Sequence, residues 1–319
     1  MKKWIFFVIL IISCKEQQTK LRYLPDSNAN INHLTVVMPK KSWNGVLGNK
    51  TRSLLETPYE GLPFDEPQFT LNYIPPKVFT GFARNSRNIL WFVKDSLARF
   101  QLTEDLMAQP QVVAKVKGED DDVQAYFLED NIKLLKAVLT ENERKEKVRR
   151  IKKSPTKDRH LHNRFKISLI YPTAYKIVKD TNNFIWIQKE IPKGHMNLIA
   201  YSLSFKALHG NVKKRIPEIR DSIGKTHIPG RLKGSYMITE KAYRPYFYKT
   251  QKGGRLTYLT KGTWEVANDF MAGPFVNYMI KDTLRKRWMV IEGFVFAPAS
   301  NKRDQIFELN TILDTVVFD

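Results

Sequence analysis

Two carboxylates of the sequence lie where they could perform acid–base chemistry. Glu292 lies within a long apolar segment, and Glu265 follows Trp264 in another strand-like segment. Glycoside hydrolysis uses two carboxylates whose pKa values differ, so a glycan-directed envelope hydrolase is one function open to this chain. A buried carboxylate paired with Arg or Lys is the more frequent role of such a residue. The sequence has no Gly-x-Ser-x-Gly, His-Glu-x-x-His or dinucleotide-binding glycine motif, so we assign no catalytic residue, metal or cofactor.

Aromatic and basic residues alternate in the stretch from residue 243 to residue 249. On one exposed face of a sheet, such side chains would stack against and hydrogen-bond a sugar or acyl ligand. Ordinary strand packing produces the same composition, so this remains a hypothesis. The candidate ligand platform comprises Tyr243, Arg244, Tyr246, Tyr248, Trp264, Glu265 and Glu292.

The only cysteine, Cys14, directly follows a short apolar stretch. Lys2 and Lys3 precede that stretch, which runs from residue 4 to residue 12 and falls well short of the roughly 20 residues of a membrane-spanning helix. The end of the stretch, Ile11-Ile12-Ser13-Cys14, resembles the bacterial lipobox, at which a signal peptide is cleaved and the cysteine receives lipid. We therefore expect Cys14 to be the lipid attachment site, and no disulfide, thiol nucleophile or thiolate metal site can form.

The charge of the chain is strongly basic. The full sequence has a net charge of +21, and cleavage before Cys14 would remove only Lys2 and Lys3, leaving +19. An excess of basic residues usually indicates that a protein binds nucleic acid, but an exported, lipid-anchored protein encounters little nucleic acid. We expect instead anionic lipid headgroups or acidic glycan, with an envelope protein partner also open.

Much of this charge lies in one segment. From residue 133 to residue 166 the sequence holds 13 basic and 4 acidic residues. We expect the end of a long helix to present this charge to an anionic surface, although a solvated helix face explains it equally well. The candidate anionic-surface contacts are Arg144, Lys145, Lys147, Arg149, Arg150, Lys152 and Lys153.

The elements that would position these residues follow from apolar periodicity. In the first part of the body, a strand is predicted over 33–38, a short helix over 42–55 and a strand over 112–116, followed by a helix from Glu119 to about residue 153. Acid-before-base pairs at i, i+4 would sustain the exposed end of that helix. The last third is predicted to be strands over 235–239, 246–250, 256–260, 275–280 and 288–296, then a helix. In the final hairpin, Asp282 would face Arg287 and Asn277 would face Glu292.

Two parts of the body have similar sequences. Residues 69–76 align without gaps on 165–172, and residues 88–95, containing Trp91, align on 183–190, containing Trp186. This predicts an internal duplication, with the two tryptophans in equivalent strands. The expected fold is α+β, with two related antiparallel sheet-and-helix halves linked by a long basic helix. The predicted divisions are a signal peptide over 1–13, a flexible tether over 14–30, an N-terminal half over 31–153 and a C-terminal half over 154–319.

Several segments along the body resemble one known family. They are Leu24-Pro25-Asp26-Ser27, Ile31-Asn32-His33-Leu34, Arg220-Asp221-Ser222-Ile223-Gly224, Gly262-Thr263-Trp264-Glu265-Val266, Asp269-Phe270-Met271-Ala272-Gly273-Pro274-Phe275 and Glu292-Gly293-Phe294-Val295-Phe296-Ala297-Pro298. The sequence resembles a Bacteroidota lipoprotein family catalogued as a domain of unknown function (domain of unknown function 4837). The resemblance implies an envelope location, expected here at the outer membrane facing the periplasm, and supplies no activity. The leading hypothesis is a non-catalytic binding or scaffold module.

Overall fold

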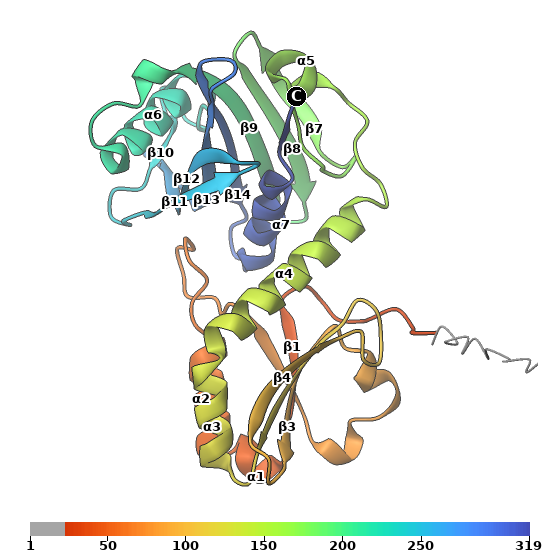
Figure 1. Ribbon diagram of the computed structural model, residues 1–319. Helices are drawn as coiled ribbons and strands as arrows, with labels where there is room; N and C mark the ends of the chain where they lie inside the picture. The colour runs from red at the N-terminus through yellow and green to blue at the C-terminus, as the bar shows by residue number, and fades with distance from the viewer. Residues whose placement is uncertain (1–22) are drawn as a thin grey trace, which may run out of the picture.

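The computed structural model describes residues 23–319, in which two sheet-and-helix halves are connected by one long helix, α4 (Ile132–Ile151; Figure 1). This confirms the α+β fold class. The predicted signal peptide and Cys14 lie outside the described residues. Within residues 23–319, no helix combines the length and the apolar character that crossing a bilayer requires.

The first half contains a five-stranded sheet covered by helices on one face. Its strands are β1 (His33–Val37), β2 (Thr70–Ile74), β3 (Asn88–Lys94), β4 (Arg99–Glu104) and β5 (Val112–Gly118), in the order β2-β1-β3-β5-β4. The helices are α1 (Lys40–Trp43), α2 (Val46–Leu55), α3 (Asp121–Asp130) and the start of α4. Leucines of α2, α3 and α4 pack on one face of the sheet. Two short 3-10 helices, η1 (Pro76–Val78) and η2 (Gly81–Asn85), belong to the segment that covers the other face through Phe79.

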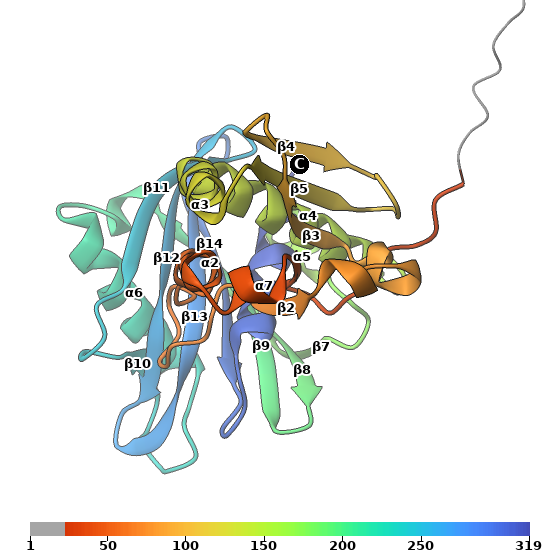
Figure 2. The same ribbon diagram turned by 90° about the horizontal axis from the view of Figure 1, so that it is seen from below.

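The second half contains an eight-stranded antiparallel sheet with helices on both faces (Figures 1 and 2). The strands of this sheet are β7 (Lys176–Thr181), β8 (Phe184–Ile191), β9 (Gly194–Ser204), β10 (Met237–Thr239), β11 (Tyr246–Lys252), β12 (Arg255–Val266), β13 (Asp269–Asp282) and β14 (Arg287–Phe296). The remaining elements are α5 (His160–Phe165), η3 (Phe205–Ala207), α6 (Val212–His227), α7 (Arg303–Asp314) and the small pair β6 (Ile167–Ser168) and β15 (Val317–Phe318).

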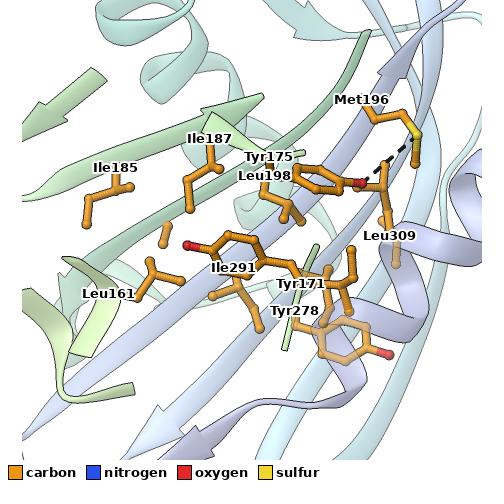
Figure 3. Packing of buried hydrophobic residues seen from close by; sticks show 14 of the residues in the cluster. Leu161, Tyr171, Tyr175, Ile185, Ile187, Met196, Leu198, Tyr278, Ile291 and Leu309 are labelled. Atoms are coloured by element: carbon orange, nitrogen blue, oxygen red, sulfur yellow. Dashed lines mark hydrogen bonds between the residues drawn. The ribbon is translucent and has the colours of Figure 1, made fainter. Parts of the chain in front are cut away.

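Each face of the second sheet has its own core. Alternate side chains of β8, β9, β12, β13 and β14 pack against α6 on one face, and the intervening ones pack against α5 and α7 on the other. Figure 3 shows the second of these cores, where tyrosines lie among aliphatic side chains. The buried hydroxyl of Tyr175 donates to Glu308 of α7 at 3.1 Å. Position along a strand therefore decides which core a residue joins.

The register of the last hairpin confirms the sequence prediction. Asp282 faces Arg287, and the Arg287 guanidinium donates to the Asp282 carboxylate at 3.0 Å. Asn277 faces Glu292 and donates to it at 2.8 Å.

The predicted duplication is wrong. β3, with Trp91, lies between two parallel neighbours, β1 and β5. β8, with Trp186, lies between two antiparallel neighbours, β7 and β9. The prediction of an antiparallel sheet therefore holds for the second half but not for the first, where only β4 pairs antiparallel. The aligned residues share an alternation of apolar and polar side chains, and strands of parallel and antiparallel sheets both produce this alternation.

The predicted exposed end of α4 is also wrong, because Asn142, Glu143 and Glu146 are buried. Glu143 accepts two hydrogen bonds of 3.0 Å from Arg87, which is itself fully buried beside β3. The predicted i, i+4 partner of Glu143, Lys147, instead binds Glu308 of α7 at 3.0 Å. α4 is thus fixed between the two halves. A break at Asn131 also divides the single predicted helix into α3 and α4.

The predicted tether is shorter than residues 14–30. From Pro25 onward the backbone is hydrogen-bonded to the first half, with Ser27 donating to Gln109 at 3.0 Å and Asn28 donating to Asn85 at 2.8 Å. Arg87 also donates to the carbonyl of Asn30 at 2.7 Å. The folded body therefore begins near residue 25, because these backbone groups find partners that the local sequence does not reveal.

Candidate functional site

A cavity of about 280 Å³ opens at one end of the α6 face of the second sheet. Its walls come from β8, β9, β10, β12, β13 and β14 and from the loop that follows α6. The apolar lining consists of Trp186, Trp264, Phe294, Phe296, Met237 and Met271, with Ile228 and Val266 completing it. The volume is just under the roughly 300–1,000 Å³ of known small-molecule sites. The cavity can therefore admit one small apolar group.

Strand alternation creates this aromatic lining. Trp186, Phe294 and Trp264 occupy strands of one sheet and point to its α6 face, so their rings meet. The Phe294 ring centroid lies 6.3 Å from that of Trp186 and 5.8 Å from that of Trp264. Gly273 makes the close packing possible, because a Cβ there would lie 2.0 Å from the Val295 carbonyl oxygen and 3.0 Å from Trp264 Nε1.

The polar side chains of the cavity lining carry nitrogen. His195 and Arg231 line the cavity, and no carboxylate does so among residues 23–319. Arg231 is two-thirds exposed and binds the buried carboxylate of Asp269 at 2.8 Å, which joins the loop after α6 to the β12–β13 turn. The Arg231 guanidinium lowers the pKa of Asp269, so this bridge is ionised at neutral pH. Next to the two bridge residues, Leu232 and Phe270 are exposed.

A larger hollow, of about 700 Å³, lies at the carboxyl ends of β3 and β5. Two of its four acidic residues serve the fold: Asp120 accepts from the Val123 amide at 2.9 Å as the N-cap of α3, and Asp121 accepts from Ser42 at 2.8 Å. These two carboxylates therefore have structural roles.

The structure does not assemble the candidate ligand platform. Tyr246 and Tyr248 of β11 pair with Lys261 and Leu259 of β12 and share a face with them, whereas Trp264 lies on the opposite face. Glu265 is adjacent to Trp264 and so points away from it. Arg244 is exposed in the turn before β11. Of the platform residues, only Trp264 lines the cavity.

The tyrosines of this platform meet the first half of the protein. Lys261 binds Glu60 at 3.1 Å and lies 5.6 Å from the centroid of the Tyr248 ring. Burial, with hydrogen bonding to Glu60, raises the pKa of Tyr248 to about 12, and burial beside Tyr246 raises that of Tyr243 to about 12. Their hydroxyls are therefore neutral at physiological pH. These side chains serve the contact between the halves.

Glu292 is buried beneath α6 and is fully paired. Arg220 of α6 donates to its two carboxylate oxygens at 2.8 and 2.7 Å, and Asn277 donates at 2.8 Å. The Arg220 guanidinium also lies 3.4 Å from the centroid of the Phe275 ring and donates to Thr239. This is the pairing of a structural carboxylate. Glu292 and Glu265 are separated by the sheet and do not form a catalytic pair.

Most of the candidate anionic-surface contacts are neutralised within the protein. Arg144 binds Glu141 at 2.6 Å, and Arg149 and Arg150 share Glu146, each at 2.6 Å. Lys147 is bound to Glu308, so of the seven candidates only Lys145, Lys152 and Lys153 are exposed and have no ion-pair partner within residues 23–319. The seven residues do not form one free basic patch.

Sequence reasoning missed the cavity. Trp186, Phe294 and Phe296 each fitted an ordinary strand, and Trp186 is 108 residues from Phe294 in the sequence. The signal that could have revealed it was the concentration of aromatic residues at one end of neighbouring strands, which is visible only after the strand order is known.

Comparisons with known proteins give a family and no activity. Residues 27–152 match the family model described as Domain of unknown function (DUF8532). No curated protein matches. Among solved structures, the Ran-binding protein Mog1p of Saccharomyces cerevisiae is 12% identical with a TM-score of 0.33, over 48% of this chain and 90% of that one. The PsbP protein of Synechocystis (CyanoP) is 8% identical with a TM-score of 0.32, over 48% and 87%.

Residues 154–315, slightly more than half of the chain, match the family model described as Domain of unknown function (DUF4837). The chain therefore belongs to the DUF4837 family of domains of unknown function.

Proposed function

We propose that this protein is a lipid-anchored binding protein of the bacterial cell envelope, and that its second half binds the apolar tail of a small anionic amphiphile. The lipobox-like end of the apolar stretch supports lipid attachment at Cys14. By resemblance we place the protein in Bacteroidota, at the outer membrane and facing the periplasm. The basic composition led us to expect anionic envelope material as the ligand. We propose that this ligand is an acyl chain with an acidic head group.

The lining of the 280 Å³ cavity carries this proposal. Four aromatic rings and two methionines offer the apolar surface that takes up a hydrocarbon chain, since each buried methylene contributes about 0.8 kcal/mol. His195 and Arg231 bring nitrogen to the same lining, and Asp269 already pairs with Arg231. We therefore expect an anionic head group to be favoured over a cationic one through hydrogen bonds to these nitrogens rather than through a free positive charge.

The paired state of Glu292 supports binding over hydrolysis. A glycan hydrolase needs two carboxylates flanking a substrate. Glu292 is engaged by Arg220 and is not part of the cavity lining, and Glu265 lies across the sheet from it. No observation favours the hydrolase, so the proposed function contains no catalytic step.

Isothermal titration of the protein with decanoate, octanoate and decanol tests this function. We expect decanoate to bind, octanoate to bind roughly tenfold more weakly because two methylenes are lost, and decanol to bind more weakly because it lacks the anionic head. Met271→Trp should fill the cavity and abolish binding. The matched control is Leu284→Trp, at a residue 73% exposed in the β13–β14 turn, which should bind as the wild type does.

Absence of decanoate binding to the wild type would contradict the proposal. Equal binding to the Met271→Trp and Leu284→Trp variants would show that decanoate associates elsewhere on the protein.

A further inference from the structure

The point at which the chain enters the folded body lies beside two exposed segments (Figures 1 and 2). We propose that these segments, 76–85 and 152–153, form a surface that contacts the anionic lipid bilayer in which Cys14 is anchored. The inference rests on the lipid anchor of the proposed function. It adds the face and the orientation that the body presents to the membrane.

Hydrogen bonds fix the first segment beside the entering chain. The Asn28 amide donates to the Asn85 carbonyl at 2.8 Å, and its side chain donates to the Phe82 carbonyl at 3.2 Å. Both views show the segment that contains η2 alongside the entry point. Its position relative to the anchor is therefore set by the fold.

The end of α4 lies on the other side of the entering chain. Arg150 donates to the carbonyl of Ala29 at 3.0 Å, and the carboxylate of Asp26 raises the pKa of Arg149, after the larger effect of Glu146. Lys152 and Lys153 follow directly and are exposed. The unpaired lysines at the end of α4 thus lie at the chain entry, where the anchored protein would contact the membrane.

The length of chain outside the structure limits how far the body can lie from the anchor. Eight residues separate Cys14 from Tyr23, and nine residue steps span at most about 30 Å when fully extended. Since residues from Pro25 onward are fixed to the body, none of them can lengthen this connection. The face around the entry therefore stays within about 30 Å of the bilayer.

The composition of this face suits the region of lipid headgroups. Val78 is 59% exposed and Phe82 is 77% exposed, although both are large apolar residues. Lys77 and Arg84 flank them and are exposed. Apolar side chains that enter the headgroup boundary, with cations around them, are the pattern of interfacial binding to anionic lipid.

Site-specific fluorescence on the lipidated, full-length protein tests this surface. Because Cys14 is the only cysteine and its thiol would be blocked by lipid, Phe82→Cys can be labelled alone with an environment-sensitive nitrobenzoxadiazole group. The control is Leu284→Cys, at a residue 73% exposed in the β13–β14 turn, which belongs to the second half, whereas the chain enters the first half (Figure 1). The proteins are reconstituted into liposomes of phosphatidylcholine with or without phosphatidylglycerol.

We expect the label at residue 82 to shift to the blue and to brighten on liposomes that contain phosphatidylglycerol, with a smaller change on neutral ones. The label at residue 284 should not change. Lys152→Glu with Lys153→Glu should reduce the shift, whereas Lys213→Glu with Lys214→Glu, a pair on α6 that is also exposed, should leave it unchanged.

Two results would overturn the inference in different ways. Liposome-bound protein with equal signals at residues 82 and 284 would leave the lipid anchor intact and remove the surface. A wild-type protein whose Cys14 thiol reacts with the label would remove the anchor and the inference with it. The binding of decanoate would still be decided separately by titration.

Discussion

The buried ion pair between Arg220 and Glu292 provides the sharpest test of the second half. Each side chain is at most 2% exposed, and the pair fixes α6 to the centre of the sheet. Replacing either residue alone with Met leaves one buried charge without its partner. Because such a loss costs about 3–5 kcal/mol, each single variant should be destabilised by that amount.

The double variant, Arg220→Met with Glu292→Met, should recover most of this stability. Two apolar side chains of similar volume need no desolvated charge, and replacements of this kind are often neutral. At about 2–4 °C per kcal/mol for a unit of this size, each single variant should lower the melting temperature by roughly 6–20 °C. Urea unfolding, followed by circular dichroism, supplies the four free energies of the double-mutant cycle.

A decrease of less than about 1 kcal/mol in the free energy of unfolding of either single variant would refute this reasoning, because removing one partner of a buried ion pair is strongly destabilising. Additive losses in the double variant would also refute it. In either case Glu292 would not be a structural carboxylate, and the case against a hydrolase would lose its main support.

Three further predictions concern separate parts of the protein. Cys14→Ala should abolish incorporation of a labelled fatty acid in cells while the body stays folded, as measured by autoradiography and circular dichroism. Gly273→Ala should lower the melting temperature by several degrees, because its Cβ would lie 2.0 Å from the Val295 carbonyl oxygen; an unchanged melting curve would contradict the packing. For Glu308, burial raises the pKa, but the two lysines that bind it lower the pKa further, to a value below the usual one. Its contribution to stability is therefore present above about pH 4.3 and is lost as the pH falls through the lowered pKa. The stability gap between the wild type and Glu308→Gln should be largest near pH 7 and close in acid, as urea titrations across pH would measure.

Local patterns allowed much of the second half to be predicted. The strands of the last third and the facing of Asn277 and Glu292 follow from the alternation of side chains within one hairpin. Such features depend on residues close in sequence, where the period of two determines which side chains share a face. The assignment of Glu292 as a paired carboxylate was open from sequence, because nothing local identifies Arg220 as its partner.

The errors arose where distant segments meet. The sequence predicts a solvated end of α4, because few apolar residues occur there. In the structure, Arg87 binds Glu143 of this end and Glu308 binds Lys147, and both partners are distant in the sequence. The parallel pairing of β1, β2, β3 and β5 likewise cannot be read from strands whose alternation suits either arrangement. The cavity joins residues of six strands and one loop.

The position of a bound acyl chain tests the central claim most directly. In protein labelled with ¹³C at the methionine methyl groups, nuclear Overhauser effects from decanoate can be assigned to individual methionines. The cavity predicts contacts from the decanoate chain to Met237 and Met271 and none to Met107, which lies in the first half. Contacts to Met107, or binding without any contact to Met237 and Met271, would contradict the proposed site.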